Sequence, residues 1–334
     1  MTAAVVEGRL LGLVSERLKQ VRAPVNVRLW NGQLIRGAEP APVTLTVHSA
    51  RALTRLARPT LGELARCYVE GEIDLDGSFR DVLRLGEALV SDRSGAYGTR
   101  LPRWRWWGHS RASDRRNIQR HYDVGNDFYA LWLDRNRVYS CAYFKTAEDT
   151  LDQAQEQKLD HICRKLLLKP GERLLDIGCG WGSLLIHAAR EYGVSGVGVT
   201  LSEAQAALAR TRIADAGLSD RIEIRVQDYR EITDGPFDKI ASVGMYEHVG
   251  RGELDRYAQT VHGLLKPGGL FLNHGIARLH SEAPDKDTFI YRYVFPDGEL
   301  SPVTDVLTSL QSAGLEVRDV ESLREHYPLT LRAW

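Results

Sequence analysis

A short stretch around Asp176 has the spacing of a ligand-binding turn. The apolar run Arg173–Ile177 contains this acid, and three glycines at alternating positions follow it: Gly178, Gly180 and Gly182. Glycine lets the backbone approach a ligand closely and adopt positive φ. A helical pattern comes next, and the first turn of a helix offers unpaired backbone N–H groups. Strand, glycine turn and helix in this order predict a site for a nucleotide-like ligand.

Three classes of ligand could use this turn. A phosphate-binding loop needs Gly-x-x-x-x-Gly-Lys-Ser/Thr, and no lysine follows Gly182. A dinucleotide site needs its third glycine one residue later and an acid about 20 residues further on, whereas the next strand ends at Thr200. S-adenosylmethionine (SAM) carries no phosphate, so a glycine turn without a phosphate clamp suits it best. A tight strand-to-helix turn in some other α/β protein remains the alternative.

The pattern around this turn alternates between strands and helices. The six predicted strands are Arg173–Ile177, Ser195–Val199, Ile222–Val226, Lys239–Val243, Leu270–Asn273 and Leu315–Val320. Helical patterns separate them, and the helix after the second strand starts with Ser202-x-x-Gln205, the spacing of a capping box. Another amphipathic helix, Leu151–Leu167, precedes the turn. This order predicts an α/β fold with a doubly wound, mostly parallel sheet and a ligand at the carboxyl ends of its strands.

The chain is long enough for two domains. It has 334 residues, of which 43% are apolar, enough for a sizeable core. Residues 1–90 predict a small α+β domain with a β-hairpin at Asn31-Gly32, whereas residues 116–334 carry the alternating pattern. The first domain contains no catalytic spacing, so we expect it to serve in docking, in lipid presentation or in forming a homodimer.

Residues 91–115 form a predicted linker that is rich in tryptophan and arginine. Between Arg100 and Arg120 there are seven arginines and a single acid, Asp114, with three tryptophans among them. Arginine and tryptophan together suit an anionic membrane surface. A solvated linker is the alternative, and although nucleic acid attracts the same residues, we expect no nucleic-acid partner.

Nothing in the sequence predicts a membrane span or a disulfide framework. No apolar run reaches about 18 residues, and the first 18 residues alternate apolar and charged positions, unlike a signal peptide. The four cysteines, at positions 67, 141, 163 and 179, form no Cys-x-x-Cys pair, and no metal site is predicted. We expect a cytoplasmic protein that binds peripherally to the inner face of the membrane.

Six stretches of sequence carry a family resemblance. They are HYDVGNDFY (121–129), YSCAYF (139–144), QKLDHICRKLLLKPGERLLDIGCGWG (157–182), GVTLS (198–202), VGMYEHVG (243–250) and FPDGELSP (295–302). In this order they resemble the cyclopropane-fatty-acyl-phospholipid synthase family of SAM-dependent methyltransferases, from about Asn117 to Trp334. The resemblance implies the class I SAM-dependent methyltransferase fold.

The resemblance also implies a SAM site. Its residues are Tyr122, Ser140, Gly178, Gly180, Thr200, Gln205 and Asp228, with Asp176 and Gln227 beside them. Asp228 would accept from the adenine amino group, and Thr200 and Gln205 would bind the ribose through neutral hydrogen bonds. Taken alone, Asp228 could equally be a surface turn residue.

The implied reaction adds a methyl group to the cis double bond of a phospholipid acyl chain. The alkene attacks the sulfonium methyl and becomes a carbocation, and a base must remove a proton from the new methyl before a cyclopropane ring can close. The resemblance implies that bicarbonate, which needs hydrogen bonds to stay charged in an apolar pocket, is this base. The implied site for it consists of Cys141, Glu247, His274 and Tyr327, with the backbone of Ile276. Each of these side chains alone could be an ordinary core or loop residue.

The sequence departs from the family pattern at its C-terminal end. Members continue for several tens of residues past the position of Trp334 and add a seventh, antiparallel strand. Strand seven is therefore expected to be missing, which would leave a sheet edge unpaired. Three other functions stay open: synthesis of methyl- or methylene-branched chains within the same family, binding of SAM or lipid without catalysis, and methylation of a polar small molecule. The acyl length, the double-bond position and the lipid headgroup also stay open.

Overall fold

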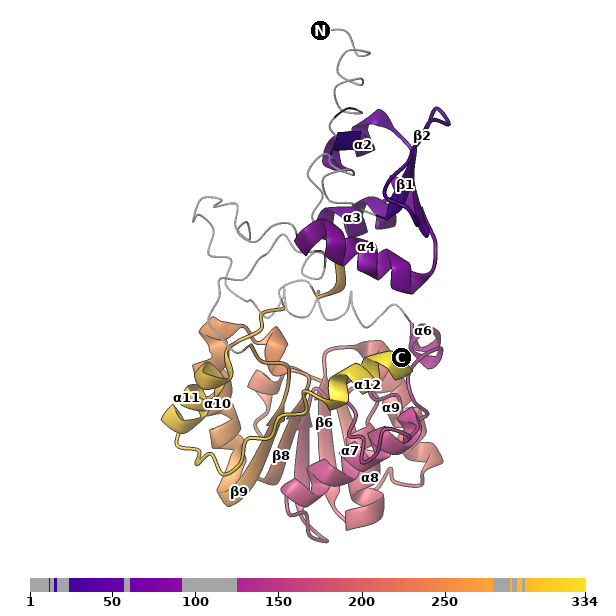
Figure 1. The fold of residues 1–334 in the computed structure, drawn as a ribbon. Coiled ribbons are helices and arrows are strands. Elements are labelled where there is room, and N and C mark those ends of the chain that lie inside the picture. The colour runs from indigo at the N-terminus through magenta and orange to yellow at the C-terminus, as the bar shows by residue number, and fades with distance from the viewer. Residues whose placement is uncertain are drawn as a thin grey trace. The chain divides into compact units, whose positions relative to one another are not determined.

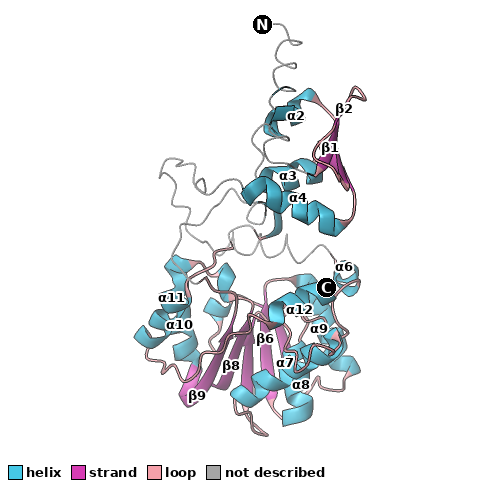
Figure 2. Cartoon of the chain, viewed as in Figure 1, coloured by secondary structure: helices cyan, strands magenta, loops and turns pink. Residues whose placement is uncertain are grey.

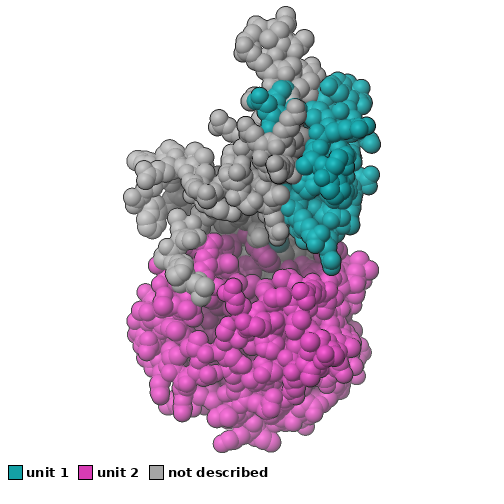
Figure 3. Space-filling view, viewed as in Figure 1, with its two compact units in different colours: residues 1–104, 285–294 teal, residues 105–284, 295–334 magenta. Residues whose placement is uncertain are grey.

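The computed structural model describes residues 24–56, 61–91, 125–278 and 298–334, with isolated positions at 12, 15, 16, 289 and 293–295. The chain forms two compact units (Figure 3). The first comprises residues 1–104 and 285–294, and the second comprises residues 105–284 and 295–334. The segment 285–294 is thus assigned to the first unit, although the sequence pattern grouped it with the second domain. Tyr122 and the predicted Trp/Arg linker after residue 91 lie outside the described residues.

The first unit contains a four-stranded sheet. Its strands are β1 (Val25–Arg28), β2 (Leu34–Ile35), β3 (Val43–Val47) and β4 (Ile73–Asp76), in the order β2-β1-β3-β4, and its described helices are α2 (Ala50–Leu56), α3 (Leu61–Val69) and α4 (Phe79–Ser91). β1 and β2 form the hairpin predicted at Asn31-Gly32, with Val27 opposite Ile35. Alternate residues of β3 point into the core, where Val43 and Val47 are fully buried. The predicted α+β class of this unit is confirmed.

The second unit holds a sheet of five parallel strands among its described residues. They are β5 (Arg173–Ile177), β6 (Ser195–Thr200), β7 (Ile222–Val226), β8 (Phe237–Val243) and β9 (Leu265–His274), in the order β7-β6-β5-β8-β9. The helices are α6 (Asn126–Ala130), α7 (Leu151–Lys165), α8 (Ser183–Tyr192), α9 (Glu203–Asp215), α10 (Leu254–Leu264), α11 (Val303–Ser312) and α12 (His326–Ala333), with short 3-10 helices η1 (Tyr229–Glu231), η2 (Tyr246–His248) and η3 (Arg251–Glu253). The strand order runs outward from β5 in both directions, which makes β5 and β8 the switch point of the sheet.

Each face of this sheet is covered by its own helices (Figures 1 and 2). Consecutive residues of a strand point to opposite faces. Leu174 of β5 therefore belongs to the core formed with α7, α8 and α9, and Leu175 to the core formed with α10 and α11. Both side chains are fully buried. The predicted doubly wound α/β fold is confirmed.

The predicted sixth strand, Leu315–Val320, is wrong. This segment follows α11 without regular secondary structure and has no ladder partner in the described part of the chain. Its apolar alternation predicted a strand, but a strand also needs a neighbour to which its backbone can hydrogen-bond. β9 is bonded to β8 on one side, and no described strand lies along its other side. The helix predicted from Tyr327 onward is confirmed as α12.

Candidate active site

The turn after β5 has the backbone geometry that its glycines predict. Gly178 and Gly180 have φ values of +79° and +52°, in the left-handed region that other residues rarely adopt. The N–H groups of Gly178 and Cys179 donate to the Val199 carbonyl at 2.9 and 3.0 Å. A Cβ on Gly178 would lie 3.1 Å from the Met245 Cγ. The backbone itself, rather than a side chain, therefore forms the surface of this turn.

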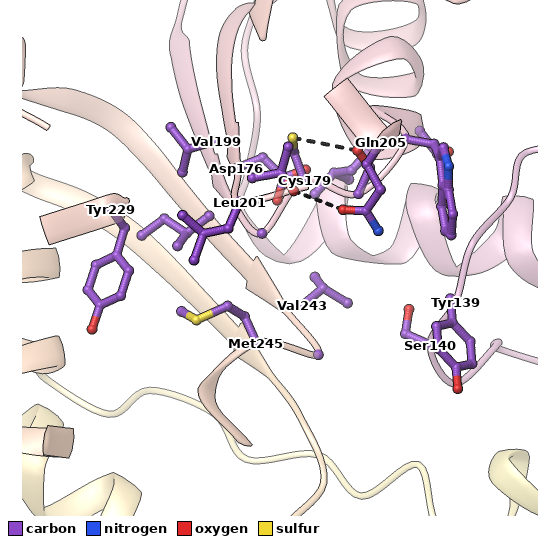
Figure 4. A pocket seen from close by; sticks show the side chains of 18 of the residues that line it. Tyr139, Ser140, Asp176, Cys179, Val199, Leu201, Gln205, Tyr229, Val243 and Met245 are labelled. Carbon is purple, nitrogen blue, oxygen red and sulfur yellow. Dashed lines mark hydrogen bonds between the residues drawn. The ribbon is translucent and has the colours of Figure 1, made fainter. Parts of the chain in front are cut away.

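A cavity with an empty volume of about 1190 Å³, partly open to solvent, lies at the carboxyl ends of β5, β6, β7 and β8. Doubly wound folds bind their ligands in this position. Eight residues predicted for the cofactor line it together: Ser140, Asp176, Gly178, Gly180, Thr200, Gln205, Gln227 and Asp228. In Figure 4, Asp176 and Gln205 lie along one wall, while Ser140 and Tyr229 lie on opposite sides. The ninth, Tyr122, lies outside the described residues.

The polar pair Thr200 and Gln205 forms part of the wall. The Thr200 hydroxyl donates to the Gln205 Oε1 at 2.8 Å, and both side chains are buried. The predicted capping box is only half present, because the Ser202 Oγ accepts from the Gln205 backbone N–H while the Gln205 side chain turns to Thr200. A hydroxyl close to the start of a helix competes for the same side-chain oxygen. The Gln205 amide group makes no hydrogen bond with a described residue as a donor, so it can donate to a ligand hydroxyl.

Asp228 is a buried acid with a partner of its own. Arg230 donates to it through its backbone N–H at 2.9 Å and through its guanidinium at 2.9 and 2.6 Å. Both side chains are less than one tenth exposed, so Asp228 is not a surface turn residue. Asp228 is thus held in a fixed orientation on the wall of the cavity.

Two buried charges line the cavity near α7. Asp176 is 3% exposed and Lys158 is 2% exposed. Burial raises the pKa of Asp176 to about 7 and lowers the pKa of Lys158 to about 8. The Lys158 Nζ donates to the Ser140 Oγ at 2.6 Å. Lys158 was not predicted from the sequence, although its place four residues before the buried Ile162 puts it on the apolar stripe of α7.

The residues predicted to hold the base lie beside this cavity and do not line it. Glu247 belongs to η2, between the lining residues Met245 and His248. It is 9% exposed; its Oε1 accepts from the Ile276 backbone N–H at 2.8 Å, and its Oε2 has no partner among the described residues. Burial raises the pKa of Glu247 to about 6. A buried carboxylate with a free oxygen can accept a hydrogen bond from a small ligand.

Tyr327, Cys141 and His274 come to this region from three other segments. Burial raises the pKa of the Cys141 thiol, and it raises the pKa of Tyr327 to about 12, with Cys141 and Glu247 acting on Tyr327 in the same direction. The loop of Cys141 and the helix of Tyr327 meet where the Ala142 backbone N–H donates to the Thr330 hydroxyl at 3.0 Å. We call Cys141, Tyr327 and Glu247 the Glu247 cluster, because the charges of the other two act on Tyr327. His274 ends β9, and burial lowers its pKa to about 3. The ring of His274 is therefore neutral, and it forms no hydrogen bond with a described residue.

Comparison with known proteins decides the family. The family model described as mycolic acid cyclopropane synthetase matches residues 109–334. The chain belongs to this family. The matched residues include every described residue of the cavity and of the Glu247 cluster.

Several relatives and solved structures resemble this cyclopropane synthetase family member. A probable fatty acid methyltransferase of Pseudomonas putida is 42% identical over 97% of this chain and 83% of its own length. The cyclopropane-fatty-acyl-phospholipid synthase of Escherichia coli (strain K12) is 45% identical over 64% of this chain and 54% of its own length. The crystal structure of mycolic acid cyclopropane synthase CmaA1 complexed with SAH and CTAB is 36% identical, with a TM-score of 0.62 over 66% of this chain and 81% of that one. The chain is a SAM-dependent methyltransferase of the class I fold.

The cavity of this methyltransferase suits SAM. From β7 through β6 to β5, the strand ends carry the acid Asp228, then Thr200, then the acid Asp176. Gln205 of α9 lies beside Thr200, and Lys158 of α7 lines the same cavity as Asp176. An extended ligand across these ends would meet acceptors for an amino group, partners for hydroxyls and charges for an amino-acid group in that order. SAM carries adenine, ribose and methionine parts in the same order, and when bound it supplies a sulfonium methyl group.

Proposed function

We propose that this methyltransferase adds the SAM methyl group to the cis double bond of a phospholipid acyl chain and closes a cyclopropane ring. The observation that supports this most is the place of the Glu247 cluster beside the cofactor cavity. Ser140 lines the cavity and the next residue, Cys141, belongs to the cluster. Ring closure needs a proton acceptor close to the methyl donor, because the transferred methyl group must lose a proton before the ring can form.

The proton acceptor in this proposal is bicarbonate held by the Glu247 cluster and His274. Neutral His274 and Tyr327 can donate hydrogen bonds to its charged oxygens, and the free Glu247 Oε2 can accept from its hydroxyl. The Cys141 thiol, which donates to the Ala142 and Leu323 carbonyls at 3.4 and 3.8 Å, would turn from them to donate as well. Bound there, bicarbonate would take up the proton that the substrate releases. The expected backbone contact from Ile276 would compete with Glu247, which already accepts from that N–H. A small diffusible base also spares the protein side chains from alkylation.

The proposed substrate is a phospholipid at an anionic membrane surface. The Escherichia coli relative is a cyclopropane-fatty-acyl-phospholipid synthase by name, and the predicted Trp/Arg linker would suit an anionic membrane surface. We place the protein in the cytoplasm, peripheral to the inner face of the membrane. None of the helices that the structure describes has both the length and the apolar content to cross a bilayer.

A second candidate is formation of a methyl- or methylene-branched chain from the same alkene. The relatives that match over most of this chain, from Pseudomonas putida and Mycobacterium tuberculosis, are named probable fatty acid methyltransferases. The two products differ in which proton leaves the carbocation. Loss of a proton from the transferred methyl, with bond formation to the cationic carbon, gives the ring. Loss of a proton from a neighbouring chain carbon gives a methyl-branched alkene. A hydride shift to the cationic carbon followed by loss of a methyl proton gives a methylene-branched chain, so both branched products keep an alkene.

Incubation of the protein with SAM and vesicles of a cis-monounsaturated anionic phospholipid tests both candidates. Mass spectrometry of the acyl chains should show a gain of one CH2 with loss of the alkene signal. A gain of CH2 with the alkene retained would favour the branched product. No gain at all, with SAM binding intact by calorimetry, would refute both. Removal of carbon dioxide and bicarbonate from the buffer should slow turnover, and added bicarbonate should restore it.

A further inference from the structure

Lys158 is a buried cation on the wall of the cofactor cavity whose hydrogen bonds are mostly unused. It is 2% exposed, and its Nζ donates a single hydrogen bond within the described part of the chain, to the Ser140 Oγ at 2.6 Å. No described carboxylate forms an ion pair with it. An ammonium has three donors, and a buried charge without partners is costly. The remaining donors are therefore available to a ligand that enters the cavity.

The position of Lys158 is fixed from two sides. One turn earlier on α7, the Gln155 Nε2 donates to the Val138 and Ser140 carbonyls at 3.1 and 2.9 Å. Gln155 is fully buried. The helix and the loop are thus tied together at Val138 and at Ser140, and the Lys158 side chain ends at the cavity rather than in solvent.

A second charge of opposite sign lines the same cavity. Asp176 is 3% exposed and forms no hydrogen bond through its side chain with a described residue. The two groups attract each other electrostatically, yet they are not an ion pair. A ligand with one carboxylate and one ammonium on the same carbon atom would satisfy both. An α-amino acid group carries this carboxylate and this ammonium on one carbon atom.

We propose that Lys158 binds the α-carboxylate of the methionine part of SAM, together with the Ser140 hydroxyl, while Asp176 faces the α-ammonium. Lys158 is then a specificity-determining residue for the cofactor. This inference rests on the SAM site alone and does not depend on which lipid is the substrate.

Isothermal titration calorimetry of the full chain with SAM and with decarboxylated SAM, which lacks only the carboxylate, tests the assignment. The unmodified protein should prefer SAM by ~10- to 100-fold, the usual effect of losing a charge-assisted hydrogen bond at a buried site. Lys158→Met should lose most of this preference by weakening SAM binding, while its affinity for decarboxylated SAM changes little. Lys169→Met, at an exposed position just after α7, is the matched control and should behave like the unmodified protein.

Two results would overturn the assignment. One is equal affinity of the unmodified protein for the two ligands, which needs no variant. The other is an equal loss of both affinities in Lys158→Met, which would mean that Lys158 only supports the loop at Ser140. If circular dichroism shows that Lys158→Met is unfolded, Lys158→Arg takes its place and must retain the preference for SAM. Failure to bind either ligand would refute the cofactor assignment itself, whereas the vesicle experiment fails separately if only the lipid is wrong.

Discussion

Glu247→Gln separates the charge of this side chain from its shape. Glutamine keeps an oxygen that can accept from the Ile276 N–H, at 2.8 Å in the present structure. The substitution removes the negative charge, which lies in a buried position beside the cavity. In the proposed function this charge orients the bicarbonate hydroxyl. The variant should therefore fold and bind SAM normally, and it should be slow in turnover.

The difference in unfolding free energy between this variant and the unmodified protein depends on pH, and the burial of Glu247 sets its direction. Burial raises the pKa of Glu247 to about 6 from an ordinary value of 4.5. Below pH 4.5 the carboxyl is neutral in both folded and unfolded chains. As the pH rises from 4.5 to 6, the unfolded chain releases this proton while the folded chain keeps it, and about 2 kcal/mol of unfolding free energy is lost. Above pH 6 both states are ionised and no more is lost. Relative to Glu247, the glutamine variant should thus gain about 2 kcal/mol between pH 4 and pH 7.5, measured by urea denaturation.

The activity of the unmodified enzyme should follow the same ionisation. With a pKa of about 6, Glu247 is almost fully ionised at pH 7.5 and only about one tenth ionised at pH 5. Turnover should fall roughly tenfold between these values. Glu247→Gln should be slower by ~100-fold or more at pH 7.5 and should show no acid limb near pH 6.

Two measurements decide the matter. The first is turnover by mass spectrometry of acyl chains across pH 5 to 8, and the second is SAM affinity by calorimetry at pH 7.5. Glu316→Gln, at an exposed position, controls for loss of an acid and should change neither. Unchanged turnover in Glu247→Gln, or an acid limb that persists in it, would show that Glu247 has no part in the reaction. Loss of SAM binding would place Glu247 in the cofactor site instead.

Three further predictions concern the turn, the cluster and the core. Gly178→Ala combines a φ of +79° with a Cβ 3.1 Å from Met245, so calorimetry should show SAM affinity reduced tenfold or more. The control Gly217→Ala is equally strained at φ +68° but faces open space, and it should keep its SAM affinity. Tyr327→Phe removes a phenol whose pKa of about 12 keeps it a donor; turnover should fall ~10-fold with unchanged SAM affinity, and equal turnover would exclude this hydrogen bond. Ile240→Ala opens a cavity at a fully buried position. Urea denaturation should show that the free energy of unfolding falls by about 2–5 kcal/mol, because the surrounding core relaxes only partly into the space.

The fold was predictable where a local pattern coincides with a structural need. Apolar runs such as Arg173–Ile177 lie in the middle of the sheet, so their burial on both faces is visible in the sequence. Leu315–Val320 also carries an apolar pattern typical of a strand, but it is not a strand. The difference between them is a hydrogen-bonded neighbour, which depends on the rest of the sheet and leaves no mark in the segment itself.

The part of the candidate site that lies at strand ends and in sequence motifs could be predicted from the sequence. Residues that follow β5, β6 and β7 line one cavity because parallel strands end at the same edge. Lys158 was missed because a lysine on a helix is most often solvated, and only its place on the apolar stripe of α7 indicated burial. The hydrogen bond of the Ala142 N–H to the Thr330 hydroxyl joins segments far apart in the chain, and no sequence spacing predicts such a contact.

One peptide bond joins Ser140, at the cofactor cavity, to Cys141, in the Glu247 cluster. Their separation is therefore a covalent length, about 3.8 Å between Cα atoms, rather than the result of two elements docking well. Motion of the loop that carries them leaves their spacing almost unchanged. In the proposed function, the walls around either residue could therefore change, for a longer chain or a different headgroup, while the residue at the methyl donor and the residue at the proton acceptor remain neighbours.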